Sequence, residues 1–291
     1  MENGPENISV IANPNAGRKN SVRFNAAMEF LKSKSDTTVH LTSFPGEAEI
    51  LARKISQSGK SLVVACGGDG TINEVANGLN PDSILGIIPA GTANVIAREL
   101  GIPLDLVEAS KALFSGAVKK TDCGHVGKRK FLMVAGFGFD AHVSGKVNPM
   151  LKKIFRIYSY HLQSALMYLS YSRPKIAVAS DKETLDGEFA LFANMRRYGG
   201  ELFFAENARF DDGMLDLVLF KKFNPQSVLI GLLGAKMRKG VPEKIAFRRR
   251  AEKFFISSSS LLPYQLDGEA FPGVLSSEVR LDKKAVLIIV P

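Results

Sequence analysis

Cysteine is scarce in this chain, and tryptophan is absent. Two cysteines, Cys66 and Cys123, occur among 291 residues. Two are too few for a disulfide framework, and their spacing is not that of a zinc site. A reducing compartment suits such a chain, so we expect a cytoplasmic protein.

Long apolar runs are also missing. No stretch approaches the roughly 20 apolar residues that a membrane-spanning helix needs. The first residues, MENGPENIS, have neither the basic nor the apolar region of a signal peptide. The sequence contains no internal repeat and no low-complexity segment. Any contact with a membrane is therefore expected to be peripheral.

Acidic residues are outnumbered: 29 Asp and Glu face 38 Lys and Arg, for a net charge of +9. A basic protein favours anionic partners, such as a nucleotide, a nucleic acid or an acidic membrane. A hydrophobic content of 45% suffices for well-packed cores, and the length suits two domains.

The pattern of elements changes near residue 124. Up to about residue 120, short apolar runs, glycine-rich turns and helical stretches alternate, which predicts a doubly wound parallel α/β domain over residues 1–124. Residues 125–291 contain short strand-like segments and two candidate helices, 150–171 and 225–237, which predicts a β-sandwich-like domain. The predicted strands of this second part are 131–135, 175–179, 188–193, 215–220, 246–257, 264–266, 278–281 and 285–290.

Three glycine-containing turns follow predicted strands of the first domain. They are NPNAG at 13–17, GGDGT at 67–71 and PAGTAN at 89–94. In an open parallel sheet the carboxyl ends of the strands share one edge, where ligands bind. Backbone N–H groups and helix N-termini at such turns bind phosphate. The carboxylate of Asp69 would repel phosphate unless a cation or a substrate proton is handled there, so the turns indicate phosphoryl transfer. A plain Gly-Asp-Gly turn is the alternative.

These motifs, with NEV at 73–75 and DGE at 267–269, resemble in order those of the diacylglycerol-kinase-like lipid kinases. That family includes bacterial soluble diacylglycerol kinases and the sphingosine and ceramide kinases. The likeness extends from Ile8 to about Leu287. GGDGT by itself also occurs in NAD kinases. The resemblance implies a phosphofructokinase- or NAD-kinase-like first domain, to which the last strand of the chain returns.

The resemblance also implies a site. Asp69 is expected to act near Mg²⁺ and the transferring phosphoryl group, and Glu269 to accept the proton of the lipid hydroxyl. A type I′ hairpin turn at Asp267-Gly268 would present Glu269. The residues expected to bind ATP are Asn13, Pro14, Asn15, Ala16, Gly17, Thr42, Gly67, Gly68, Asp69, Gly70, Thr71, Asn73 and Thr92.

A second cation site is implied at RFDDGM, residues 209–214. There the resemblance suggests a structural Mg²⁺ held by the Asp212 side chain and by the carbonyls of Arg209 and Met214. A solvated acidic turn is the alternative.

One position departs from the family. In many relatives an aspartate at this position joins an ionic cluster with three other charged residues, whose counterparts here are Arg18, Arg98 and Asp122. Val95 removes one negative member of that cluster. Interfacial activation through the cluster is therefore in doubt for this chain.

The segment 236–250 holds seven basic residues and one acid, Glu243. Such a strip can bind an anionic membrane surface, although a solvated basic face is an equal alternative. The helix predicted at 150–171 could expose an apolar face to lipid. No nucleic-acid-binding motif accompanies the basic residues, so we expect no nucleic-acid partner. Monomer and homodimer both stay open.

The sequence thus predicts an ATP- and Mg²⁺-dependent lipid kinase that acts at the membrane surface, with conversion of diacylglycerol to phosphatidic acid as the leading reaction. A sphingoid-base kinase, an NAD kinase and a non-catalytic lipid- or nucleotide-binding regulator are the alternatives.

Overall fold

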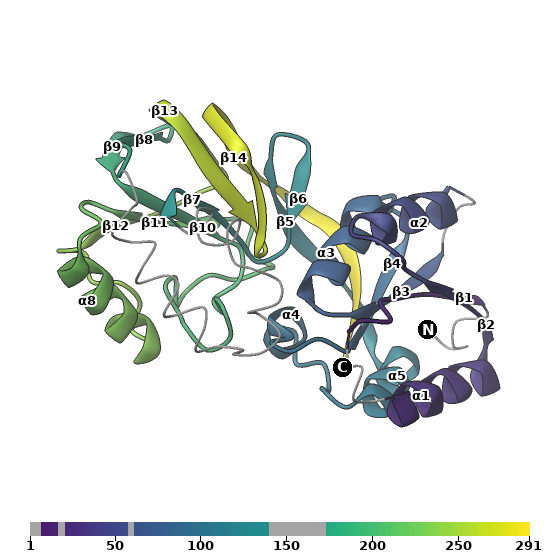
Figure 1. Ribbon diagram of the computed structural model, residues 1–291. Helices are drawn as coiled ribbons and strands as arrows, with labels where there is room; N and C mark the ends of the chain where they lie inside the picture. Colours follow the sequence, from purple (N-terminus) through teal and green to yellow (C-terminus); the bar gives the residue numbers. More distant parts are fainter. Residues whose placement is uncertain (1–6, 17–20, 58–60, 140–172) are drawn as a thin grey trace. The chain divides into compact units, whose positions relative to one another are not determined.

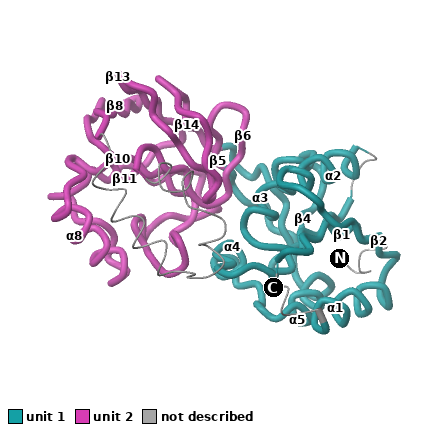
Figure 2. Tube along the Cα trace, viewed as in Figure 1, with its two compact units in different colours: residues 1–123, 282–291 teal, residues 124–281 magenta. Residues whose placement is uncertain are grey.

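The computed structural model describes residues 7–16, 21–57, 61–139 and 173–291 (Figure 1). The chain forms two compact units (Figure 2). The first comprises Met1–Cys123 and Asp282–Pro291, and the second comprises Gly124–Leu281. The sequence placed the division at 124/125 and expected the last strand to join the first domain. The predicted helix at 150–171 lies outside the described residues.

The first unit is built on a parallel sheet. Its strands are β1 (Asn7–Ala12), β2 (Asp36–Leu41), β3 (Leu62–Gly67), β4 (Ile84–Pro89) and the end of β14 (Glu269–Val290). The order is β2-β1-β3-β4-β14, and each of these neighbours pairs in parallel. β3 is buried along its whole length, as expected for a strand covered on both faces. The predicted α/β class of this domain is confirmed.

Helices cover both faces of this sheet (Figure 1). Their bounds are α1 (Ser21–Lys34), α2 (Glu47–Ser56), α3 (Asp69–Gly78), α4 (Val95–Glu99) and α5 (Leu106–Ser115). α1 packs with α5, and α2 packs with α3. The α2–α3 contact is close because Gly78 has no side chain: a Cβ there would lie 2.3 Å from the Glu49 carbonyl oxygen.

The second unit is a β-sandwich-like domain, as predicted. Its strands are β5 (Ala117–Val126, which begins in the first unit), β6 (Arg129–Phe131), β7 (Val134–Phe137), β8 (Ile176–Ala179), β9 (Thr184–Gly187), β10 (Phe189–Ala193), β11 (Leu215–Phe220), β12 (Ala246–Ala251), β13 (Lys253–Leu266) and most of β14. One helix, α8 (Pro225–Lys236), follows β11. β13 pairs with β7 near one end and with β8 near the other. The aromatic side chains of Phe131, Phe137, Phe192 and Phe254 lie in the core that these strands enclose.

Several predicted boundaries are wrong. The single strand predicted at 131–135 is interrupted because the Asp267 carboxylate accepts the N–H groups of Leu132, Met133 and Val134. The strand predicted at 246–257 divides into β12 and the start of β13, and the later short strands are parts of two long ones, β13 and β14. The sequence missed β5 and β9. Among the described residues, no helix is long and apolar enough to cross a membrane.

Candidate functional site: a cavity at the carboxyl ends of the parallel strands

The glycine-containing turns begin at one edge of the first unit's sheet. In the strand register, Ala12 is the partner of both Leu41 and Cys66, and Gly67 is the partner of Pro89. The turns that follow β1, β2, β3 and β4 therefore leave the sheet at the same level. A cavity of about 390 Å³ lies among them.

Seven of the residues predicted to bind nucleotide line this cavity, and they come from the turns after β1, β2 and β3. They are Asn13, Asn15, Ala16, Thr42, Gly68, Gly70 and Thr71. Gly68 precedes the first residue of α3, so the N-terminus of that helix opens beside the cavity. Backbone N–H groups and a helix N-terminus at one point form a site for an anion such as a triphosphate.

Two glycines let the turns after β3 and β4 touch. A Cβ on Gly91 would lie 2.5 Å from Gly68 Cα and 2.8 Å from Asn94 Oδ1. Asn94 lies in the left-handed region, with φ 48°, and its Oδ1 accepts the Gly91 N–H at 2.9 Å. The PAGTAN turn is thus held in a single shape against GGDGT, and any side chain at Gly91 would separate the two.

Asp69 ties these turns together. Its Oδ1 accepts the N–H of Ile96 at 2.9 Å, in the first turn of α4. The residue is half-buried at the first position of α3 and does not itself line the cavity. No donor among the described residues engages Oδ2. Asp69 therefore positions α4 through one oxygen and has the other available beside the phosphate-binding turns.

Other predicted residues do not line the cavity. Asn73 is buried in α3, where its Oδ1 accepts from Asn77 Nδ2 at 2.9 Å. Pro14 and Thr92 are exposed, and Gly67 is buried at the end of β3. Gly17 lies outside the described residues. Their roles in nucleotide binding stay predictions.

The structure adds residues that sequence reasoning missed. Phe44 and Pro45, which follow β2, form an apolar wall of the cavity, and the Phe44 side chain is 54% exposed. Glu74, the acid of the NEV motif, also lines the cavity, and its Oε2 accepts the Ala48 N–H at 3.2 Å near the start of α2. An aromatic residue followed by proline in the turn after a predicted strand was a signal that could have identified Phe44.

Glu269 belongs to the second unit and is exposed at the start of β14. Asp267 and Gly268 have φ values of 49° and 92°, and Leu266 pairs with Glu269. These values and the two-residue loop are those of the predicted type I′ turn. Three N–H groups, from Leu132 to Val134, donate to the Asp267 carboxylate at 2.7–2.9 Å. The turn that carries Glu269 is therefore anchored to β7 and the residues before it.

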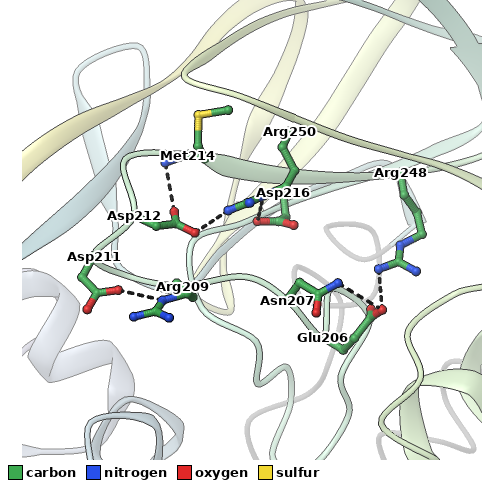
Figure 3. A network of polar contacts seen from close by, with 9 residues as sticks. All are labelled: Glu206, Asn207, Arg209, Asp211, Asp212, Met214, Asp216, Arg248 and Arg250. Atoms are coloured by element: carbon green, nitrogen blue, oxygen red, sulfur yellow. Dashed lines mark hydrogen bonds and ion pairs between the residues drawn. The ribbon is translucent and has the colours of Figure 1, made fainter.

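The predicted structural magnesium site contains a network of ion pairs (Figure 3). Asp212 Oδ1 accepts the Met214 N–H at 3.1 Å, and Asp212 Oδ2 pairs with the guanidinium of Arg250. Nε of Arg250 also lies 3.2 Å from Oδ2 of Asp216, its partner across β11 and β12. Burial raises the pKa of Asp216 to about 6, and Arg250 acts in the opposite direction. Arg209 pairs with Asp211.

These residues, as they lie, do not fit a bound divalent cation. Both Asp212 oxygens already have a partner, and Mg²⁺ would have to displace the positive charge of Arg250. Within the described ranges, no three His, Cys, Asp or Glu residues lie close enough to hold a metal ion. The ligand set Asp212, Arg209 and Met214 stays a prediction.

Of the expected ionic cluster, Val95 is buried, Arg98 Nε donates to the Ala93 carbonyl oxygen at 3.0 Å, and Asp122 Oδ1 accepts the Lys284 N–H at 2.8 Å. Arg18 lies outside the described residues. Both of these hydrogen bonds join a side chain to a backbone group.

Comparison with known proteins assigns the family. A family model described as the diacylglycerol kinase catalytic domain matches residues 7–126, and one described as the YegS C-terminal NAD kinase beta sandwich-like domain matches residues 133–290. A diacylglycerol kinase of Bacillus subtilis (strain 168) is 29% identical over 290 residues, covering 97% of this chain and 95% of that protein. One of Staphylococcus carnosus (strain TM300) is 27% identical over 267 residues, covering 89% and 87%.

The fold agrees with these matches. A crystal structure described as a diacylglycerol kinase from Bacillus anthracis str. Sterne superposes with a TM-score of 0.71 at 22% identity, over 99% of this chain and 97% of that one. The two family models together span both units. The chain therefore belongs to the diacylglycerol-kinase-like family, and it is a lipid kinase.

Proposed function

We propose that this enzyme transfers the γ-phosphoryl group of ATP to the hydroxyl of diacylglycerol and so makes phosphatidic acid. The observation that carries the proposal is the cavity at the aligned strand ends, which is lined by the glycine-containing turns of a kinase domain. The identity of the lipid follows the names of the relatives from B. subtilis and S. carnosus.

The cavity suits ATP in two respects. Gly68, Gly70 and Thr71 offer backbone N–H groups and a hydroxyl beside the N-terminus of α3, where triphosphate oxygens would be held. The exposed ring of Phe44, with Pro45, offers an apolar surface on which a nucleobase would stack. Asn13 and Thr42 add polar groups between these two ends.

Mg²⁺ is part of the proposal because the transferred phosphoryl group is highly charged. The Asp69 carboxylate suits this cation: it is half-buried, it lies next to the phosphate-binding turns, and only its Oδ1 is committed to a backbone N–H. When bound, Mg²⁺ would neutralise developing charge on the phosphate oxygens. Ile96, which donates to Oδ1, would keep the carboxylate in place.

Glu269 is the proposed general base. A lipid hydroxyl is a weak nucleophile until a carboxylate accepts its proton in the transition state. As the oxygen attacks the γ-phosphorus, a new P–O bond forms, the bond to the β-phosphate bridge breaks, and ADP leaves. The anchored type I′ turn supports this role, because it fixes the backbone at Glu269 while leaving the residue exposed.

We also propose peripheral association with an anionic membrane. The net charge of +9 supports it. The strip 236–250 has less uncompensated positive charge than its composition suggests. Arg248 pairs with Glu206, Arg249 with Glu183, and Arg250 with Asp212 and Asp216. The remaining basic residues of the strip lie before β12.

A phosphate-transfer assay tests the proposed function. Purified protein is incubated with radiolabelled ATP, Mg²⁺ and a panel of lipids that includes diacylglycerol and a sphingoid base, with NAD as a further acceptor. Diacylglycerol should give the highest kcat/KM. Glu269→Gln should lower kcat by roughly 10²-fold or more, whereas Glu278→Gln, which changes another carboxylate on β14, should keep activity within about twofold. A preferred acceptor other than diacylglycerol would refute the assignment of the lipid, and full activity of Glu269→Gln would refute the base.

A further inference from the structure

Helix α8 exposes large apolar side chains instead of burying them. Leu229, Leu232, Leu233 and Met237, the residue after the helix, are between 37% and 60% exposed. Their spacing of three, four and eight residues places them along one face. α8 lies at the outer edge of the second unit (Figure 1). This is a continuous apolar stripe, which we call the α8 stripe.

The opposite face of α8 explains why these leucines do not reach the core. The buried residues of the helix are Ser227, Gly231 and Ala235, all of them small. A Cβ on Gly231 would lie 2.9 Å from the ring of Phe220, and one on Gly234 would lie 2.2 Å from the Gly240 carbonyl oxygen. Small residues thus bring the helix close to the strands, and its bulky residues are left on the outer side.

The charged residues of the segment that contains the stripe are all basic. Residues 221–241 contain no acid. They contain five basic residues, all exposed: Lys221, Lys222, Lys236, Arg238 and Lys239. The Lys221 ammonium lies over the ring of Phe247, and the Arg238 guanidinium lies over Phe203. The nearby carboxylate of Glu206 pairs with Arg248 at 2.5 Å.

An apolar face with a basic rim is the arrangement of helices that lie in a membrane interface. A second copy of this chain would bring one basic rim against another, which opposes self-association. An anionic bilayer satisfies both features, because it offers acyl chains to the leucines and phosphates to the lysines.

We propose that α8 docks this enzyme on anionic bilayers, with the α8 stripe at the boundary of the acyl chains and Lys236, Arg238 and Lys239 at the lipid headgroups. The inference rests on the proposed function, since it names the surface through which a kinase of a bilayer lipid reaches its substrate. The three basic residues belong to the amino end of the strip 236–250, whereas Leu229, Leu232 and Leu233 of the stripe lie outside it.

The absence of tryptophan provides a direct probe. In Leu232→Trp the single indole reports the environment of the stripe, and in Leu261→Trp it reports an exposed apolar position on β13. Vesicles of phosphatidylglycerol should shift the emission of Leu232→Trp to the blue and leave that of Leu261→Trp unchanged. Equal shifts, or none in either variant, would overturn the proposal.

Sedimentation with the same vesicles tests the apolar stripe and the basic residues separately. The double variant Leu229→Ser, Leu233→Ser should bind at least tenfold more weakly than the unchanged protein, as should Lys236→Gln, Lys239→Gln. The control Leu261→Ser, Leu275→Ser removes two exposed leucines from β13 and β14 and should bind within twofold. Because the charge variant keeps every apolar residue, it decides the question even if the leucine variant does not fold.

Activity separates this inference from the proposed function. The leucine variant should lose at least tenfold in activity on diacylglycerol in vesicles and stay within twofold on a short-chain diacylglycerol dispersed in water. Equal activity of the variant and the unchanged protein on vesicles would overturn docking through α8. If neither lipid form were phosphorylated by the unchanged protein, the proposed function would fail, and the fluorescence and sedimentation results would still decide the docking surface. A change of oligomeric state or melting temperature with unchanged vesicle binding would assign the stripe to another occupant and overturn the proposal.

Discussion

Replacement of Gly91 by alanine tests whether close contact between two turns builds the nucleotide site. The new Cβ would lie 2.5 Å from Gly68 Cα and 2.8 Å from Asn94 Oδ1. Carbon atoms in contact normally lie about 3.5–4.0 Å apart, so the two turns must separate by roughly 1 Å. Overpacking of this kind costs about 1–3 kcal/mol.

Gly70→Ala is the matched control from the same motif region. No atom lies within 4 Å of a Cβ placed on Gly70, and the residue is in the first turn of α3. Alanine in a helix is more stable than glycine by roughly 0.5–1 kcal/mol. The two variants should therefore differ in free energy of unfolding by about 1.5–4 kcal/mol, with Gly91→Ala the less stable.

Urea denaturation of the nucleotide-free protein measures this difference, and steady-state kinetics measures the second consequence. Because Gly68 lines the cavity, its displacement in Gly91→Ala should raise the KM for ATP several-fold. If Gly91→Ala unfolded at the same urea concentration as Gly70→Ala and kept its KM, the contact between the turns would not hold the site together.

Three further predictions concern the same molecule. Burial raises the pKa of the Cys66 thiol to about 12, so the thiol stays protonated as the pH rises from 7 to 9. A thiol reagent should therefore label Cys66, and the buried Cys123, only after unfolding. Labelling of either cysteine in the native protein would contradict this. EDTA should leave the melting temperature of the nucleotide-free protein unchanged, because Arg250 already neutralises Asp212; a rise on adding Mg²⁺ would support the magnesium ligand set instead. Phe44→Ala should raise the KM for ATP by roughly 3- to 10-fold with little change in kcat, since stacking of an aromatic ring contributes about 0.5–1.5 kcal/mol; an unchanged KM would exclude Phe44 from the nucleobase site.

The charge pattern shows how far sequence reasoning extends in this chain. Seven basic residues in the strip 236–250 suggested a single cationic surface. In the fold, β12 lies beside β11, and Arg250 faces Asp216 across the pair. The acids that neutralise Arg248, Arg249 and Arg250 lie between 34 and 66 residues away in the sequence. A count of charges along the chain cannot include such partners.

The sequence by itself determined the alternation of strands, turns and helices in the first unit, the glycine-containing turns at one sheet edge and the Asp267-Gly268 hairpin. Each of these depends on residues that are neighbours in the chain, through apolar periodicity or the positive φ of a turn. Only the tertiary structure decided that Asp69 holds α4, that Asp267 interrupts the strand before β7, that Phe44 forms a wall of the cavity and that the leucines of α8 face outward. The physical reason is that hydrogen-bond partners and burial are set by segments that meet only after the chain has folded.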